Sequence, residues 1–261
     1  MQRTNPEKGF TLTGIPGLDD MLGGGIPTGH AISVFGGPGA GKTTFSLQFL
    51  YNGATLYDEP GIYVSLDESI SDIKRNVRAY GWDFERLEKE QKIVFLDASF
   101  FKRISDVVKV SEDEKKNEKG FSISRLRNLI DDTIQEMDAK RVVVDPMSTL
   151  IFQYPDLNER RLAVIDLITT LRSRPNCTSF IIMDLRSSTL EREYQIEEFL
   201  TQGTIILQTM PQPEAGLAII CLIEKMRGTE HDTQPHPYLI TKQGITIFPN
   251  EKVYATAVPN R

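Results

Sequence analysis

Short apolar runs rich in β-branched residues recur along the chain, and they predict the strands of a sheet. Most of these runs are separated by stretches whose apolar residues have helical spacing. Strands that alternate with helices predict a mainly parallel sheet covered by helices on both faces. The expected strands are 31–35, 61–66, 92–97, 141–145, 178–183, 204–208 and 217–224, and the expected helices are 42–56, 69–80, 122–138, 157–173 and 190–201.

The pattern changes after residue 203. The last two of these strands are separated by 211–216, a Pro- and Gly-containing stretch typical of a hairpin turn. A further pair of strands is expected at 236–241 and 245–248, joined by a short turn at 242–244. The predicted fold class is therefore α/β, with antiparallel C-terminal strands appended to the parallel sheet.

The length of the chain suits one large α/β domain. No linker rich in Pro, Gly or Ser divides the 261 residues, so we expect a single domain over 1–261. We place its core at about 10–250, between short tails. A dense run of mixed charges at 111–119 predicts a solvated, mobile loop over about 111–120.

Charge and cysteine content narrow the class of protein further. The net charge of −6 argues against a surface that coats nucleic acid, although a local basic patch stays open. Cys177 and Cys221 lack CxxC spacing, which favours two buried thiols in a reducing compartment. Residues 1–6 have no apolar signal segment, and no apolar run is long enough to cross a bilayer. We therefore expect a soluble, cytoplasmic protein.

A glycine-rich loop follows the first expected strand. Residues 36–43 read GGPGAGKT, a full match to the phosphate-binding pattern G-x-x-x-x-G-K-[ST]. Glycines let backbone N–H groups line a concave loop, and the helix that follows presents its positive end to an anion. Lysine and a hydroxyl then serve the outer phosphates and a magnesium ion. The residues predicted to bind nucleotide here are Gly37, Pro38, Gly39, Ala40, Gly41, Lys42, Thr43 and Thr44.

The strand predicted at 141–145 ends in a carboxylate, Asp145. Its carboxyl end is expected at the same sheet edge as the glycine-rich loop, where Asp145 and Thr43 would hold Mg²⁺. The alternative is that Asp145 only caps the next loop, since Pro146 and Ser148 follow. No His/Cys cluster has metal-ligand spacing, so Mg²⁺ with nucleotide is the only metal expected.

Two acids, Asp67 and Glu68, follow the strand predicted at 61–66. Hydrolysis needs a carboxylate to orient or deprotonate the attacking water, and either acid is a candidate. We favour Glu68 because of its longer reach, with Asp67 close behind. The alternative is that one of them supplies negative charge to the start of the next helix.

Two cations close together follow the strand predicted at 217–224. Residues 225–231 read KMRGTEH, and arginine and lysine can neutralise charge on a leaving phosphate, often from a neighbouring subunit. From composition alone this segment would more often be an ordinary polar turn. Its functional interpretation depends on a family resemblance.

The chain resembles the KaiC family of RecA-like ATPases over almost its whole length. The motifs that carry the resemblance are 13–27, the loop at 36–43, 67–69, 76–83, 196–203 and 225–229. The resemblance implies a RecA-like core, ATP with Mg²⁺, and a homo-oligomeric ring, usually a hexamer, with ATP at each subunit boundary. It implies that a neighbouring subunit contributes Lys225, Met226, Arg227, Gly228, Thr229 and His231 to the nucleotide site.

Three departures from the family pattern modify this picture. Asp67 is one methylene shorter than the usual glutamate, which leaves the identity of the base open. The strand end at 181–184 lacks the Thr or Ser that often senses the γ-phosphate, which predicts slow or conditional hydrolysis unless Arg186 or Ser187 replaces it. Residues 199–200 are Phe-Leu where the autokinase half of the family's circadian member has a Ser-Thr pair. This argues against autokinase activity at that site, while Thr201 nearby leaves another acceptor hydroxyl open.

Three candidate functions remain for this chain. The favoured one is an ATPase ring that regulates a protein partner, which the sequence does not identify. The second is a recombinase paralogue that binds single-stranded DNA, against which the acidic balance counts. The third is an ATP sensor or scaffold that does not hydrolyse its nucleotide, suggested by the altered strand end at 181–184.

Overall fold

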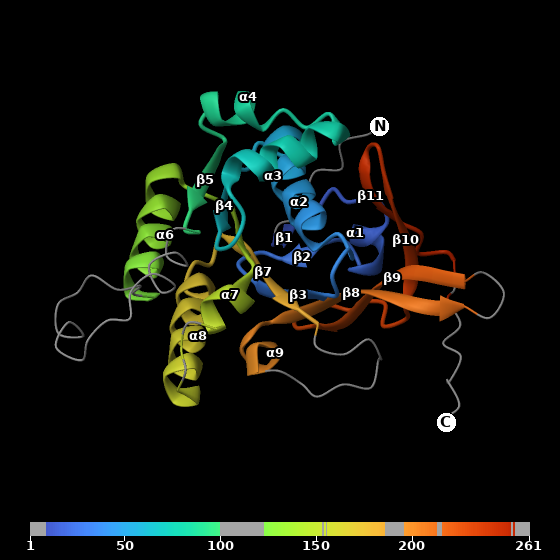
Figure 1. Cartoon of the computed structure of the whole chain (residues 1–261). Coiled ribbons are helices and arrows are strands. Elements are labelled where there is room, and N and C mark those ends of the chain that lie inside the picture. The colour runs from blue at the N-terminus through green and yellow to red at the C-terminus, as the bar shows by residue number, and fades with distance from the viewer. Residues whose placement is uncertain are drawn as a thin grey trace.

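The computed structural model describes residues 9–99, 123–152, 154, 156–185, 196–212, 216–251 and 253. Its centre is a nine-stranded sheet in the order β11-β10-β9-β8-β3-β7-β6-β4-β5 (Figure 1). A separate two-stranded sheet pairs β1 with β2. The strands are β1 (Phe10–Thr11), β2 (Ile26–Pro27), β3 (Ala31–Gly36), β4 (Gly61–Ser65), β5 (Ile93–Asp97), β6 (Arg141–Asp145), β7 (Thr178–Asp184), β8 (Gly203–Gln212), β9 (Gly216–Met226), β10 (His236–Thr241) and β11 (Gly244–Ile247).

The large sheet is parallel from β8 to β5 and antiparallel from β8 to β11. β3 lies between β7 and β8, and Gly36 at its end is in register with Asp184 and Leu207. The predicted α/β fold, with its mainly parallel sheet and appended antiparallel strands, is confirmed. Because the parallel strands share one direction, their carboxyl ends form a common edge.

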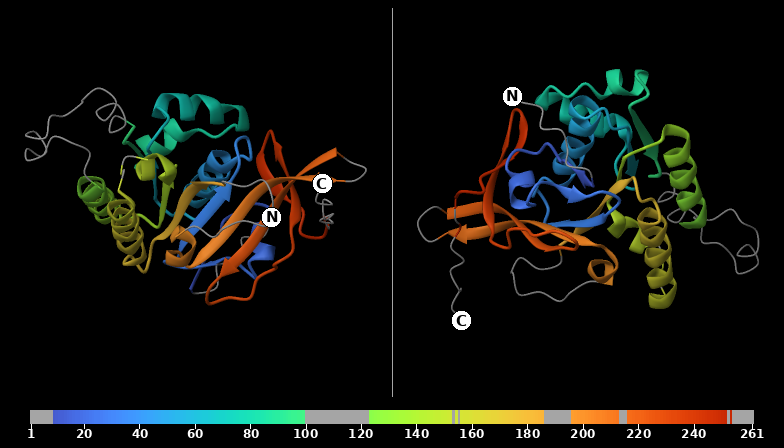
Figure 2. Two further views of the ribbon diagram at one scale, coloured as in Figure 1. Left: turned by 60° about the horizontal axis from the view of Figure 1, so that its bottom comes forward. Right: turned by 180° about the vertical axis from the view of Figure 1, so that it is seen from behind.

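Helices cover both faces of the sheet, and α6 and α8 lie side by side on one of them (Figure 2). Successive strand residues point to opposite faces, so Val143 packs with α2, whereas Val142 and Val144 pack with α6 and α8. The helices are α1 (Leu18–Met21), α2 (Lys42–Leu56), α3 (Ile70–Val77), α4 (Phe84–Lys89), α6 (Ile123–Met137), α7 (Met147–Phe152), α8 (Leu157–Arg172) and α9 (Ile196–Leu200), with a 3-10 helix at Arg78–Tyr80.

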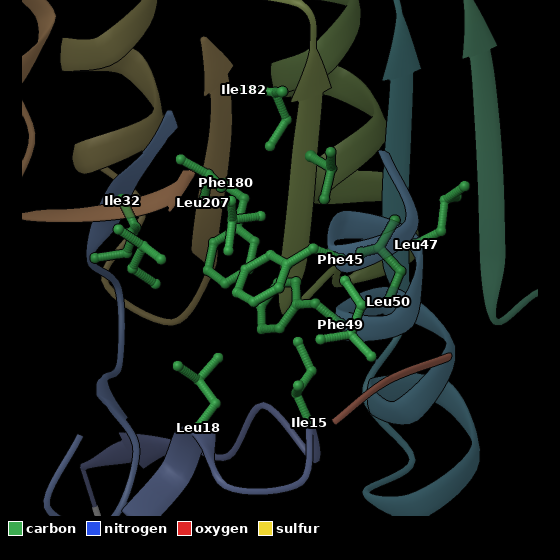
Figure 3. Close-up of a cluster of buried hydrophobic side chains, with 14 of the residues drawn as sticks. Ile15, Leu18, Ile32, Phe45, Leu47, Phe49, Leu50, Phe180, Ile182 and Leu207 are labelled. Carbon is green, nitrogen blue, oxygen red and sulfur yellow. The ribbon is translucent and has the colours of Figure 1, made fainter. Parts of the chain in front are cut away.

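Helix α2 is the most deeply packed of these elements. All residues from Phe45 to Leu50 are buried, because the sheet lies on one side of the helix while β11 contacts another side. Phe180 of β7 stacks on Phe49 and Phe45, with ring centroids 4.1 Å and 5.7 Å apart (Figure 3). Such aromatic contacts add to area burial and fix the helix that begins at the glycine-rich loop.

Several boundaries differ from the predicted ones. The hairpin strands are longer than expected, and Pro211 lies within β8 rather than in the turn. A proline is tolerated there because pairing with β3 ends at Leu207. The short elements α1, α4, α7, β1 and β2 were not predicted, since each is too short to show a helical or strand period. The loop expected at 111–120 and residues 190–195 of an expected helix lie outside the described residues.

No helix among the described residues is long and apolar enough to cross a membrane. Cys177 and Cys221 are free, buried thiols, as predicted. Burial raises the pKa of each thiol to about 12, so both keep their protons at neutral pH.

Candidate nucleotide site

The glycine-rich loop connects the end of β3 to the start of α2 at the carboxyl edge of the sheet. Gly39 and Gly41 have φ angles of 76° and 77°, in the left-handed region that residues with a Cβ rarely adopt. Gly41 is the N-cap of α2, and Lys42 is the first residue of the helix. The loop therefore presents the first N–H groups of α2, where the helix dipole favours an anion.

Lys42 lies against this loop, with its side chain largely buried. Its Nζ donates hydrogen bonds to the carbonyl oxygens of Gly36, at 2.8 Å, and Gly37, at 3.2 Å. Nζ also forms an ion pair of 3.2 Å with Oδ1 of Asp184, the last residue of β7. Ser148 Oγ donates a 2.6 Å hydrogen bond to the other oxygen of Asp184. The lysine ammonium is thus surrounded by oxygen acceptors at the position predicted for the outer phosphates.

Asp145 ends β6 close to the first turn of α2. Thr43 Oγ1 donates a 2.8 Å hydrogen bond to Oδ2 of Asp145, and Tyr63 of β4 donates a 2.6 Å hydrogen bond to the same oxygen. Burial raises the pKa of Asp145, while these two hydrogen bonds act in the opposite direction. Burial and the Asp145 charge raise the pKa of Tyr63 well above its usual range, so the phenol keeps its proton. The carboxylate therefore faces the glycine-rich loop rather than only capping the next one.

Asp67 and Glu68 follow the end of β4 at the same sheet edge, and both are exposed. Ser69 caps α3 by accepting a 3.2 Å hydrogen bond from the Asp72 N–H, so the two acids precede the helix cap. Ser65 Oγ donates a 2.6 Å hydrogen bond to the Glu68 carbonyl, which fixes the backbone directly after the two acids. Both acids remain candidates for the base.

These side chains line a pocket of about 180 Å³. Its lysine and helix start suit phosphate oxygens. Thr43 gives its one proton to Asp145 and keeps its oxygen lone pairs for a cation, and Mg²⁺ prefers such hydroxyl and carboxylate oxygens. The residues present therefore fit a nucleoside triphosphate with Mg²⁺. The pocket is lined by Lys42, Thr43, Tyr63, Ser65, Asp67, Glu68, Ile73, Asp145, Pro146 and Asp184.

The segment 225–231 lies at the opposite edge of the sheet. β9 returns antiparallel to β8, so Met226 is in register with Gly203, which pairs with Ile32 near the start of β3. Gly36 is four positions beyond Ile32, which is about 13 Å along a strand. The segment is therefore remote from the glycine-rich loop of its own chain.

The predicted trans residues differ in their surroundings. Lys225 Nζ donates hydrogen bonds of 2.6 Å to the carbonyl oxygens of both Glu198 and Thr201, at the end of α9. Burial lowers the pKa of Lys225, and the charge of Arg227 acts in the same direction. Met226 is buried and packs against Gly203, so its side chain is not presented to a ligand.

The rest of this segment is more open. Arg227 and Gly228 are exposed, while Thr229 and His231 are half-buried. His231 Nδ1 lies 3.4 Å from the Thr229 carbonyl oxygen. Arg227 is therefore the cation of this segment that is best placed to meet another molecule.

Five residues of the pocket were not among the predicted site residues, and two of these, Tyr63 and Asp184, contact the side chain of a predicted one. Tyr63 is in the interior of a predicted strand, where an aromatic residue indicates only core packing. In the sequence, the strand end at 181–184 was considered only because it lacks a Thr or Ser, and the charge of Asp184 was given no role. The available signal was that Asp184, like Asp145, is an acid at the end of an expected parallel strand.

Comparisons with known proteins agree with this fold. The sequence model of the family described as "ATPase: KaiC" matches residues 11–252. The chain is 35% identical over 237 residues to the circadian clock oscillator protein KaiC of Synechococcus elongatus, a match that covers 91% of this chain and 44% of the relative. The chain thus spans about half the length of the KaiC proteins that it matches.

Other relatives match along most of their length. A UPF0273 protein of Thermotoga maritima is 34% identical over 242 residues, covering 92% of this chain and 96% of the relative. The crystal structure of a KaiC-like protein from Pyrococcus horikoshii OT3 superposes with a TM-score of 0.77 at 32% identity, covering 92% of this chain and 99% of that one. The chain belongs to the KaiC family of ATPases.

Proposed function

We propose that this protein binds ATP with Mg²⁺ in the pocket at the carboxyl edge of the sheet and slowly hydrolyses it to ADP and phosphate. The outer phosphates replace Asp184 as the partner of Lys42, and the N–H groups of the loop surround these phosphates. Thr43 and Asp145 hold Mg²⁺, which supplies charge neutralisation at the phosphates when bound. The observation that carries the proposal is the 2.8 Å hydrogen bond between these two residues, which lie 102 positions apart.

Asp67 or Glu68 serves as the base that orients the attacking water. Hydrolysis is slow because the side chain at the end of β7, Asp184, is a carboxylate, which repels a γ-phosphate instead of donating a hydrogen bond to it. The predicted replacements Arg186 and Ser187 lie outside the described residues.

The test compares Lys42→Ala with Lys92→Ala, which alters a half-buried lysine paired with Asp58 at the amino end of β5. We expect Lys42→Ala to weaken binding of a fluorescent ATP analogue and to reduce phosphate release, each by at least about 100-fold. Lys92→Ala is expected to match the wild-type protein in both assays. Equal activity in wild type and Lys42→Ala would refute the proposed site.

We further propose that the protein acts as a ring, with ATP between subunits, and regulates a protein partner. The support is geometric, because Arg227 lies at the sheet edge opposite to Lys42 of the same chain. Only a neighbouring subunit could bring Arg227 to the nucleotide. Light scattering with and without ATP would measure the size of the assembly.

Mixing two inactive variants tests the shared site. Lys42→Ala subunits keep Arg227, and Arg227→Ala subunits keep Lys42, so some boundaries in a mixed ring contain both residues. Random mixing in equal amounts should restore about a quarter of the wild-type rate per site. No recovery in rings shown to be mixed would rule out a contribution from Arg227 of a neighbour.

The second candidate, an ATP sensor without turnover, is favoured by one observation. Asp184 pairs with Lys42 at the strand end that lacks the Thr or Ser with which the family often senses the γ-phosphate. Chromatography of nucleotide released after prolonged incubation separates the two functions. ATP retained without ADP would favour the sensor, and accumulation of ADP would favour the ATPase.

A further inference from the structure

Tyr63 lines the pocket, and the proposed chemistry gives it no role. It lies in the middle of β4, and its side chain is fully buried in the core beside α2. The Tyr63 ring packs at a tilt against Phe95, with centroids 5.6 Å apart. A phenylalanine would satisfy this apolar setting equally well, so the phenol oxygen needs a separate explanation.

The phenol oxygen makes a directed contact with a carboxylate of the site. It donates to Oδ2 of Asp145 at 2.6 Å, the oxygen that also accepts from Thr43 at 2.8 Å. Asp145 is only 6% exposed, so water supplies little of its hydrogen bonding. Two donors on one oxygen fix the carboxylate more firmly than either alone, because each restricts rotation about the Cβ–Cγ bond.

The two donors have different relations to a bound cation. Thr43 lies in the first turn of α2 and is itself a proposed ligand of Mg²⁺, so binding of the cation involves its hydroxyl directly. Tyr63 is anchored in the sheet by its strand and by ring packing, so its hydrogen bond to Asp145 is present before and after binding. It can hold the carboxylate in place while the Thr43 hydroxyl binds the cation.

We propose that Tyr63 is a positioning residue, whose phenol orients Asp145 for Mg²⁺ that accompanies the nucleotide. The inference rests on the proposed function, because it assigns Tyr63 to the same site. If this role is correct, loss of the phenol hydroxyl weakens the effect of Mg²⁺ on nucleotide binding and leaves metal-free nucleotide binding unchanged.

The experiment measures binding of a fluorescent ADP analogue to Tyr63→Phe, first in EDTA and then as Mg²⁺ is titrated. We expect the dissociation constant in EDTA to stay within about twofold of wild type. The Mg²⁺ concentration at half-maximal effect should rise about tenfold, in the range typical of residues that orient a metal ligand. Tyr51→Phe is the matched control, because Tyr51 lies on α2 and contacts Trp82 and Phe84 through its ring.

A purely structural role gives a different result. It would weaken nucleotide binding by the same factor in EDTA and in Mg²⁺, and that result, or an unchanged Mg²⁺ requirement, would overturn the inference alone. No nucleotide binding by the wild-type protein would overturn the proposed function as well.

A thermal measurement keeps the inference testable if Tyr63→Phe folds poorly. Loss of the phenol leaves a buried carboxylate with one donor fewer, so the variant should unfold at a lower temperature than wild type. In an Asp145→Asn background, Tyr63→Phe should lower the midpoint of thermal unfolding by less than half of the drop that it causes in the wild-type background. An equal drop in both backgrounds would show that Tyr63 does not act through Asp145.

Discussion

The buried guanidinium of Arg141 forms an ion pair with Glu59 and links three segments of the chain. Arg141 opens β6, is fully buried, and donates from Nε to Glu59 at 2.7 Å. Its Nη1 donates to the Phe49 carbonyl in α2 at 2.7 Å, and its Nη2 donates to the Leu12 carbonyl at 2.6 Å. One guanidinium thus ties together the strand that ends in Asp145, the helix that begins at Lys42, and the N-terminal segment.

The perturbation we choose is Arg141→Met, which keeps an unbranched chain and removes the charge. Burial lowers the pKa of Arg141 and the Glu59 charge opposes this shift, so the cation depends on its partner. Removing one member of a buried pair costs about 3–5 kcal/mol, because the other charge is left without a partner. For Arg141→Met we expect a loss of about 3–4 kcal/mol in the free energy of unfolding, the lower half of this range, because the Glu59 side chain is 24% exposed and can reach water.

Urea and thermal unfolding, followed by circular dichroism, measure this loss. At about 2–4 °C per kcal/mol the midpoint should fall by roughly 6–16 °C. The control is Arg127→Met, whose ion pair with Asp166 at 2.9 Å has both side chains about one-third exposed. That pair should contribute about 0–1 kcal/mol. Adding Glu59→Gln to Arg141→Met should recover part of the stability, because it removes the unpaired charge.

The reasoning would be refuted if Arg141→Met and Arg127→Met lowered the free energy of unfolding equally. It would also be refuted if Glu59→Gln failed to recover any stability in the Arg141→Met background. Either result would mean that the guanidinium contributes packing rather than a paired charge.

Three further predictions concern a charge at the site and the thiols in the core. Asp184→Asn removes a carboxylate that competes with phosphates for Lys42, so affinity for ATP and ADP should rise about two- to fivefold in a fluorescence titration, and weaker binding would contradict it. Cys177 and Cys221, with pKa values raised to about 12, should react with a disulfide reagent at about pH 8 only after denaturation. Because unfolded thiols ionise first, the free energy of unfolding should fall as pH rises from about 9 towards 12, as urea titrations at several pH values would show.

The strands could be predicted because burial on both faces requires continuous apolar runs. Val142, Val143 and Val144 face alternate cores, so no polar residue interrupts the run. Helix α1 could not be predicted, because its four residues do not complete a helical repeat. Leu18 and Met21 become helical through packing on the sheet, a contact that only the complete fold provides.

At the site, the sequence indicates which residues share the sheet edge but not which bonds they form. Asp145 and Asp184 both end parallel strands, and their local sequences do not distinguish their partners. The strand order does, because β7 lies directly beside β3 and brings Asp184 level with Gly36, next to Lys42. Asp145, one strand further away, meets Thr43 where α2 begins.

The same limit applies to the two cations near the end of β9. The family resemblance treats Lys225 and Arg227 alike, yet their positions relative to the sheet differ. Lys225 lies within β9 opposite Thr204, and its ammonium reaches the last carbonyls of α9. Arg227 follows the strand, and its side chain is exposed. A neighbouring nucleotide would have to compete with α9 for Lys225 but not for Arg227, so Arg227 is the residue on which the mixing experiment should be built.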